Sequence, residues 1–362
     1  MHIVHTEASL GWGGQEIRIL TEAAGMMARG HKVTLLCPPQ AKIFGEAQAR
    51  NIPVTALPIG RKNLRGMLAM RRWLKKHPAD VINTHSSTDS WLVALASLGL
   101  RHAPPLVRTR HISAPIPNNF TTRWLYRKAT RHIATTGGLL RQQLIDSNGY
   151  APEQITSVPT GIDTAHFVPG DKSAARNALG LPHDAPIVGI VATLRSWKGH
   201  TYLLDAFAGL KDPATRLLII GDGPQRDALH KKIAELGLEG RVVMPGNQRD
   251  VLPWLQAMDI FALPSYANEG VPQAILQAML CGLPIVSTPI GSILEAVQHE
   301  QTGLIVEPRQ AEPLRLALER LLADQALRHE LGQAALLRAR AKFGMEAMLD
   351  KMEIIFREAI KQ

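Results

Sequence analysis

Short apolar runs alternate with segments of helical periodicity over most of this 362-residue sequence. An apolar run at residues 2–5 precedes a glycine-rich loop at 11–14, and residues 17–27 then carry the apolar spacing of an amphipathic helix. The same order of strand, loop, helix and strand recurs from residue 186 to residue 220. Strands that alternate with helices in this way favour parallel sheets.

Further strands are predicted at residues 33–36, 81–82, 106–107, 133–134, 242–243, 260–263 and 285–286, and the tail from 312 to 362 has a helical pattern. We therefore predict an α/β protein with two Rossmann-like, doubly wound domains. A boundary near residues 158–163 gives an N-terminal domain at 1–165 and a C-terminal domain at 166–344. A last helix, about 345–362, is expected to pack back on the first domain. Since open parallel sheets bind ligands beyond the carboxyl ends of their strands, we expect the two domains to face each other across one cleft.

Composition places the chain among soluble globular proteins, with 45% hydrophobic and 20% charged residues. The longest apolar run, residues 91–100, is half of the roughly 20 residues that a membrane-spanning helix needs. The first residues lack the pattern of a signal peptide. Cys37 and Cys281 are far apart in the sequence and are expected to be buried, reduced thiols. These features predict a cytoplasmic protein.

The positive charge is concentrated in the first half of the chain. Residues 1–165 carry 20 basic and 9 acidic side chains, whereas residues 166–362 carry 21 and 22. A segregated basic surface predicts a polyanionic partner such as a phosphorylated glycan or an anionic membrane. Nucleic acid is disfavoured, because aromatic residues make up only 5% of the chain and no stacking platform is evident.

One segment, residues 61–76, combines basic and apolar positions without any acid. An apolar stripe interrupted by one base is formed by Leu64, Met67, Leu68, Arg71 and Leu74, and Trp73 lies in the same segment. This pattern predicts a basic amphipathic helix at the surface of an anionic membrane, with an ordinary domain helix as the alternative. Its basic residues are Arg61, Lys62, Arg65, Arg71, Arg72, Lys75 and Lys76.

A candidate anion site begins at Glu269. Pro272 suits the first turn of a helix, and the backbone N–H groups of Gly270 and Val271 would then lie at its positive end. A carboxylate just before that helix can accept hydrogen bonds from sugar hydroxyls. The alternative is a capped core helix with an exposed acid.

Arg195 and Lys198 lie three residues apart between a predicted strand and helix. A guanidinium and an ammonium group can together hold a diphosphate and neutralise it as a leaving group. Two solvated loop cations are the alternative.

Other features are weaker. Gly13 and Gly14 follow the first strand but do not complete a dinucleotide fingerprint, and the glycines near 221–223 favour a plain turn. His111 follows a strand and is either a structural histidine or a residue of the cleft. No cluster with metal-ligand spacing is found.

Taken together, these segments resemble the retaining GT-B glycosyltransferases of family 4 over nearly the whole chain. The resemblance rests on an ordered series of motifs at residues 13–16, 159–163, 195–199, 220–224, 269–277 and 282–288.

The resemblance implies a role for each matching position. Arg195 and Lys198 would hold the donor diphosphate, Glu269 the donor sugar, and His111 a sugar hydroxyl. The other donor-binding positions would be Gly13, Gly14, Gly223, Asn247, Gly270, Val271 and Gln277. It also implies retention of the anomeric configuration, no metal ion or other cofactor, and a UDP- or GDP-linked donor.

Gln277 departs from the family pattern, which has a second acid at this position for the ribose hydroxyls. An amide can both donate to and accept from a diol, so we expect binding to survive with a loss on the order of 1 kcal/mol. The alternative is a catalytically degenerate GT-B protein that binds nucleotide sugars without turnover.

The sequence-based hypothesis is therefore a glycosyltransferase that modifies a cell-envelope glycan or a lipid-linked acceptor, with lipopolysaccharide core as the leading candidate. It would act at the inner face of the cytoplasmic membrane as a peripheral protein. A GT-B sugar-nucleotide epimerase remains a further alternative.

Overall fold

A computed structural model describes residues 1–361. The chain divides into two compact units, each of which is described by itself. Unit 1 comprises Met1–Gly161 and the segment that begins at Glu346, and unit 2 comprises Ile162–Met345.

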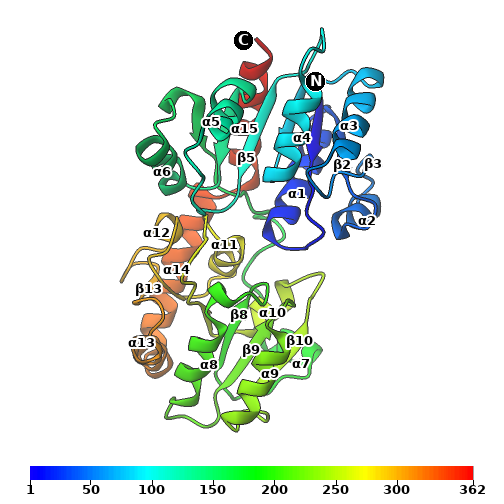
Figure 1. Cartoon of the computed structure of the whole chain (residues 1–362). Helices are drawn as coiled ribbons and strands as arrows, with labels where there is room; N and C mark the ends of the chain where they lie inside the picture. The colour runs from blue at the N-terminus through cyan, green and yellow to red at the C-terminus, as the bar shows by residue number, and fades with distance from the viewer. Residues whose placement is uncertain (362) are drawn as a thin grey trace. The chain divides into compact units, whose positions relative to one another are not determined.

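Unit 1 is built on a seven-stranded parallel sheet in the order β3-β2-β1-β4-β5-β6-β7 (Figure 1). Its strands are β1 His2–Thr6, β2 Lys32–Cys37, β3 Val54–Ala56, β4 Val81–Thr84, β5 Leu106–Arg110, β6 His132–Thr135 and β7 Ile155–Ser157. Its helices are α1 Gly14–Ala28, α2 Lys42–Ala49, α3 Leu64–Lys76, α4 Ser87–Ser97, α5 Phe120–Trp124, α6 Gly138–Asn148 and α15 Met345–Lys361.

Unit 2 has a six-stranded parallel sheet in the order β10-β9-β8-β11-β12-β13. Its strands are β8 Ile187–Val191, β9 Arg216–Ile220, β10 Val242–Gly246, β11 Ile260–Leu263, β12 Ile285–Ser287 and β13 Gly303–Ile305. Its helices are α7 Lys172–Leu179, α8 His200–Ala208, α9 Arg226–Glu235, α10 Leu252–Ala257, α11 Gln273–Leu280, α12 Ile293–Ala296, α13 Ala311–Ala323 and α14 Gln325–Lys342.

The predicted α/β class and both doubly wound sheets are confirmed. Every predicted strand is present, and three strands of three residues each, β3, β7 and β13, were not predicted. All three lie at sheet edges. An edge strand pairs on one side only, so a short one lacks the continuous apolar run by which a central strand is identified.

The basic segment forms α3, but its core-facing side differs from the predicted stripe. The buried residues are Gly66, Met70, Trp73 and Leu74, whereas Leu64 is 66% exposed. Trp73 packs in the core of unit 1 and stacks on His77, with ring centroids 4.8 Å apart. The tryptophan is therefore a core residue and cannot anchor the helix in a membrane.

The last helix, α15, belongs to the packing of unit 1. A Cβ atom on Gly25 of α1 would lie 2.5 Å from Leu349, so a glycine there lets the two helices approach closely. Arg29 forms ion pairs with Glu346, Asp350 and Glu353 of α15. Among the helices of residues 1–361, none combines the length and hydropathy that a bilayer span requires.

Candidate functional site

The topology of unit 2 places its candidate residues at one point of the sheet. Strands β8 and β11 are neighbours, and the chain leaves them for opposite sides of the sheet. Ligands bind at such switch points, beyond the carboxyl ends of the strands. The loop after β8 carries Arg195 and Lys198, and the loop after β11 carries Glu269.

Lys198 and Glu269 are in direct contact. The Lys198 Nζ atom donates to Glu269 Oε1 at 2.6 Å, and the Ser265 hydroxyl donates to the same oxygen at 2.6 Å. Glu269 is only 4% exposed, so both partners are needed to stabilise its charge. The alternative of an exposed acid beside a capped helix is therefore wrong.

Two glycines hold these loops together. Gly199 has a positive φ of 78°, and a Cβ atom there would lie 2.0 Å from the carbonyl oxygen of Pro264. Gly291, with φ of 56°, meets the carbonyl oxygen of Glu269 at the same distance. The Tyr266 N–H also donates to the Trp197 carbonyl at 2.8 Å. Only glycine combines this backbone conformation with such an approach, so the Lys198–Glu269 contact is fixed by the backbone.

Helix α11 begins one residue later than expected. Pro272 has φ of −68° and ψ of 126° and is the N-cap, so it precedes the first turn. Gly270 and Val271 are buried just before it. Gln277 is 8% exposed on α11, and its amide makes no hydrogen bond within residues 1–361. The amide is therefore available for a ligand.

Arg195 is exposed and lies at the start of the short 3₁₀ turn Ser196–Lys198. Its guanidinium is 5.6 Å from the centre of the Trp197 ring and has no acidic partner in the described part of the chain. An unpaired guanidinium beside a switch point is suited to bind an anion.

The structure gives the glycines of the next loop a packing role. Gly223 has φ of 158°, and a Cβ atom there would lie 2.8 Å from the carbonyl oxygen of Leu194. The Leu194 N–H in turn donates to the carbonyl of Asp222 at 3.0 Å. Gly223 thus holds the loop that carries Arg195, and Asn247 is exposed directly after β10.

In unit 1, the corresponding switch point lies between β1 and β4. Gly13 is the N-cap of α1 and Gly14 its first residue. His111 follows β5, and its Nε2 atom is 3.0 Å from Nδ1 of His85. Burial and the positive charge of Arg18 lower the pKa of His111 well below its usual range, so its ring is neutral at pH 7.

The predicted basic surface is present except at one position. Arg71 donates to the Ala96 and Leu98 carbonyls at 2.7 and 2.6 Å, so it fastens α3 to the end of α4 and does not belong to the exposed face. Lys62 donates to the Ser87 hydroxyl at 3.0 Å, and burial and Arg108 lower its pKa. The exposed cations are Arg61, Lys62, Arg65, Arg72, Lys75 and Lys76.

Sequence reasoning missed Ser265, His5 and His85. Ser265 is the second residue after β11, and His85 directly follows β4 as His111 follows β5. Position after a strand was therefore the signal that could have found two of them. Within residues 1–361, no three or more His, Cys, Asp or Glu side chains are arranged so that they could hold a metal ion.

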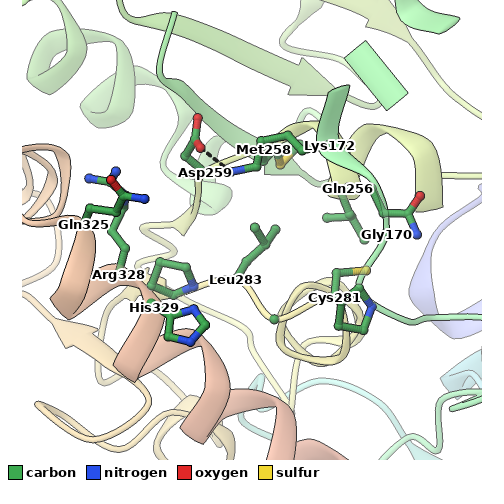
Figure 2. Close-up of a pocket in the computed structure, with 14 residues that line it drawn as sticks. Gly170, Lys172, Gln256, Met258, Asp259, Cys281, Leu283, Gln325, Arg328 and His329 are labelled. Atoms are coloured by element: carbon green, nitrogen blue, oxygen red, sulfur yellow. Dashed lines mark hydrogen bonds and ion pairs between the residues drawn. The ribbon is translucent and has the colours of Figure 1, made fainter. Parts of the chain in front are cut away.

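A cavity of about 300 Å³ in unit 2 lies away from this site. Figure 2 shows Asp259, which directly precedes β11, with Lys172 donating to it, and Cys281 on another wall. The cavity is thus at the amino ends of the strands, opposite Arg195 and Glu269. Burial raises the pKa of the Cys281 thiol to about 12, which keeps it protonated and unreactive.

Comparison with known families gives two adjoining matches. Residues 12–166 match the model of glycosyltransferase family 4, and residues 171–338 match that of glycosyl transferases group 1. A relative from Corynebacterium aurimucosum, named D-inositol 3-phosphate glycosyltransferase, is 31% identical over 310 residues, which cover 78% of this chain and 72% of the relative. One of the same name from Saccharomonospora viridis is 27% identical over 96% of this chain and 90% of its own length.

Solved structures share the fold. A glycosyltransferase from Rickettsia africae superposes with a TM-score of 0.87 at 21% identity, covering 100% of this chain and 99% of its own. The Anabaena protein HepE, in complex with UDP-glucose, gives 0.88 at 23% identity over 99% and 100% of the two chains.

Proposed function

This chain belongs to the family 4, group 1 glycosyltransferases of the GT-B fold, and from that premise we propose a retaining, metal-independent sugar transfer from a nucleoside-diphosphate sugar to an anionic acceptor of the cell envelope. The observation that carries the proposal is the cluster at the β8–β11 switch point. There an unpaired guanidinium, an ammonium group and a buried carboxylate lie on two adjoining loops.

The cluster supports binding of the donor by charge. Arg195 and Lys198 neutralise the diphosphate, and the N–H groups before α11 add the positive end of a helix. Glu269 accepts from hydroxyls of the donor sugar, and Gln277 takes the ribose diol by donating and accepting. In the bound state, Lys198 exchanges part of its contact with Glu269 for phosphate oxygens.

Uracil is the first candidate nucleobase, with guanine as the second. HepE is known in complexes with UDP and UDP-glucose, and its chain matches this one over nearly its full length. A binding panel of nucleoside diphosphates distinguishes the two bases.

In the proposed reaction, the acceptor hydroxyl attacks the anomeric carbon from the face that the diphosphate leaves. A new bond forms between the acceptor oxygen and this carbon while the bond between the carbon and the phosphate oxygen breaks. The leaving phosphate oxygen takes the hydroxyl proton. Arg195 and Lys198 stabilise the charge that develops on the diphosphate, which is a larger effect in the transition state than in the ground state.

The acceptor is proposed to be anionic because residues 1–165 carry 20 basic side chains and only 9 acidic ones. The relatives named above carry inositol 3-phosphate in their names, and structural neighbours include a lipopolysaccharide outer core galactosyltransferase. A phosphorylated sugar or polyol, free or in a lipid-linked glycan, agrees with the names of these relatives and of this structural neighbour. The exposed face of α3 would hold the protein at an anionic bilayer.

The test is a transfer reaction of the full chain with UDP- and GDP-sugars and a phosphorylated acceptor, in the presence of EDTA. NMR of the product gives the anomeric configuration. We expect the donor's configuration to be kept and the rate to be unchanged by EDTA. An inverted product or a rate that EDTA abolishes would contradict the proposed mechanism, and nucleotide binding without any transfer would favour the degenerate alternative.

A further inference from the structure

Three histidines line one face of the unit 1 sheet at its carboxyl edge. Strands β1, β4 and β5 are neighbours, and the register pairs His5 with Asn83 and Asn83 with Val107. Because side chains alternate between faces along a strand, His85 and His111 lie on the same face as His5. Two of them follow a strand end directly, as ligand-contacting residues of such sheets do.

The three rings form one continuous chain of contacts. His5 Nδ1 is 3.0 Å from His85 Nε2, and His85 Nδ1 is 3.0 Å from His111 Nε2. His5 is fully buried and His85 is 4% exposed. The outer nitrogen, Nδ1 of His111, has no hydrogen-bond partner within residues 1–361.

Burial, together with the positive charges nearby, keeps all three histidine rings neutral. Burial and Arg18 lower the pKa of His5 to about 3 and that of His85 and His111 well below the usual range. Arg108 and Arg110 add positive potential at His111. Asp89 accepts the His85 backbone N–H at 2.9 Å, but burial raises the pKa of this carboxyl. Each ring therefore carries one N–H at pH 7.

With three ring protons and two ring-to-ring contacts, the protons can be placed on the ring nitrogens in only two ways. The middle ring is neutral, so it donates through one nitrogen and accepts through the other. Either every ring carries its proton on Nδ1, and donation runs from His5 toward His111, or every ring carries it on Nε2, and donation runs inward.

The surroundings of His5 distinguish these two proton arrangements. Its Nε2 atom is buried without a hydrogen-bond partner, and so are Nη2 of Arg18 and its Nε atom, which lies 3.7 Å from Glu22 Oε2. A proton on His5 Nε2 would add another buried, unpaired donor in the field of a cation, whereas a bare nitrogen presents a lone pair that the cation stabilises. The Nδ1–H arrangement is therefore favoured, and it leaves an N–H on the outer nitrogen of His111.

We propose that His5 and His85 are positioning residues that hold His111 in its Nδ1–H form, so that its outer nitrogen is a fixed hydrogen-bond donor. The catalytic consequence rests on the proposed function: His111 then donates to an oxygen of the transferred sugar and does not remove a proton. A donor oriented before the ligand arrives needs no reorganisation during the reaction.

The direct test is NMR of the full chain without substrate. Protein labelled with ¹⁵N-histidine is measured at pH 7.5 by long-range proton–nitrogen correlation, and the ring signals are assigned by their loss in single His5→Asn, His85→Asn and His111→Asn variants. We expect the Nδ1–H pattern for all three rings. An Nε2–H pattern, a mixture of the two or a charged ring at His111 overturns the proposal, whether or not the protein transfers sugar.

Activity provides a second readout with matched variants. His85→Asn keeps an amide near the position of Nδ1 and can still donate to His111, whereas His85→Phe cannot. We expect kcat to fall at least tenfold in His85→Phe and to recover most of this loss in His85→Asn, with the nucleotide Kd unchanged in both. His132→Phe changes a buried histidine of β6 that is not one of the three contacting histidines, and it controls for packing. Equal losses in His85→Phe and His85→Asn would indicate a purely structural role.

Discussion

Glu269 is a buried carboxylate whose charge depends on two neighbours, the ammonium group of Lys198 and the hydroxyl of Ser265. Removing one partner of a buried ion pair leaves the other charge without compensation, which destabilises proteins by about 3–5 kcal/mol. Substitution of Lys198 thus removes a cation from the proposed diphosphate site and also disturbs the carboxylate proposed to bind the sugar. Both effects act on the proposed transfer of the sugar from the diphosphate.

At the residue scale, Lys198→Ala is expected to remove nearly all turnover, by a factor of at least 100. The measurement is the initial rate of sugar transfer at saturating acceptor. Lys211→Ala changes an exposed lysine of the same unit and serves as the control. A Lys198→Ala rate within tenfold of the wild type would contradict the proposed role.

The sequence assigned Arg195, Lys198 and Glu269 to one donor site only through the family resemblance, and the structure places Lys198 and Glu269 in contact. It was not sufficient to find Ser265 or the histidine chain. A hydrogen-bond partner is recognised by a distance of about 3 Å between atoms, and no spacing along the chain encodes such a distance between His5 and His85.

At the scale of single elements, α3 shows how a helix divides its faces. Leu64, Leu68, Arg65, Arg72 and Lys75 project from one exposed side, opposite the core residues Met70 and Trp73. Periodicity predicted the helix, but sequence alone did not assign Trp73 to the core. An indole in a basic helix suits a membrane interface and a protein core equally well, so only packing distinguishes them.

This exposed face predicts salt-dependent binding to anionic vesicles. Arg65→Glu combined with Arg72→Glu should weaken sedimentation with liposomes of phosphatidylglycerol at low salt by at least about 30-fold, since each of the two lost cations contributes about 1 kcal/mol near such a surface. Lys231→Glu, at an exposed lysine of unit 2, is the matched control. Absence of binding by the wild-type chain at low salt would contradict the membrane proposal.

At the scale of the whole molecule, unit 1 encloses several groups with displaced pKa values. The folded-state pKa of His5 is lowered from 6.5 to about 3, so the unfolded chain binds this proton first as the pH falls. His5 therefore contributes stability that is present above pH 6.5 and is lost as the pH falls toward 3. Glu7 acts in the opposite direction: burial and Asp89 raise its pKa to about 8, so its contribution is lost as the pH rises from 4.5 to 8.

A comparison of the wild type with a His5 variant separates the contribution of His5 to stability from that of Glu7. The free energy of unfolding by urea is measured for the wild type and His5→Asn at pH 6.5 and pH 5.0. Relative to the variant, the wild type should lose about 2 kcal/mol over this interval, since one displaced proton changes stability by about 1.4 kcal/mol per pH unit. His230→Asn, at an exposed histidine, should run parallel to the wild type, and a His5→Asn curve parallel to it as well would show that His5 titrates normally.

Architecture could be predicted at this scale because two sheets repeat one alternating pattern. The three short edge strands could not, since each has only three residues and contributes little to the periodicity. The donor base, the acceptor and any partner are selected by contacts between side chains and other molecules. Hydrophobic periodicity predicts strands and helices but not such contacts.

The most direct test of the central claim is a thermal-shift panel of UDP, GDP, ADP and CMP, with EDTA present, on the wild type, Lys198→Ala and Lys211→Ala. A ligand at about 100 times its Kd stabilises the folded protein by about 2.7 kcal/mol, which is readily measured. The account predicts that one nucleoside diphosphate, UDP first and GDP second, shifts the wild type and Lys211→Ala but not Lys198→Ala. An equal shift in all three proteins, or no shift with any nucleotide, would contradict a diphosphate site at Arg195 and Lys198.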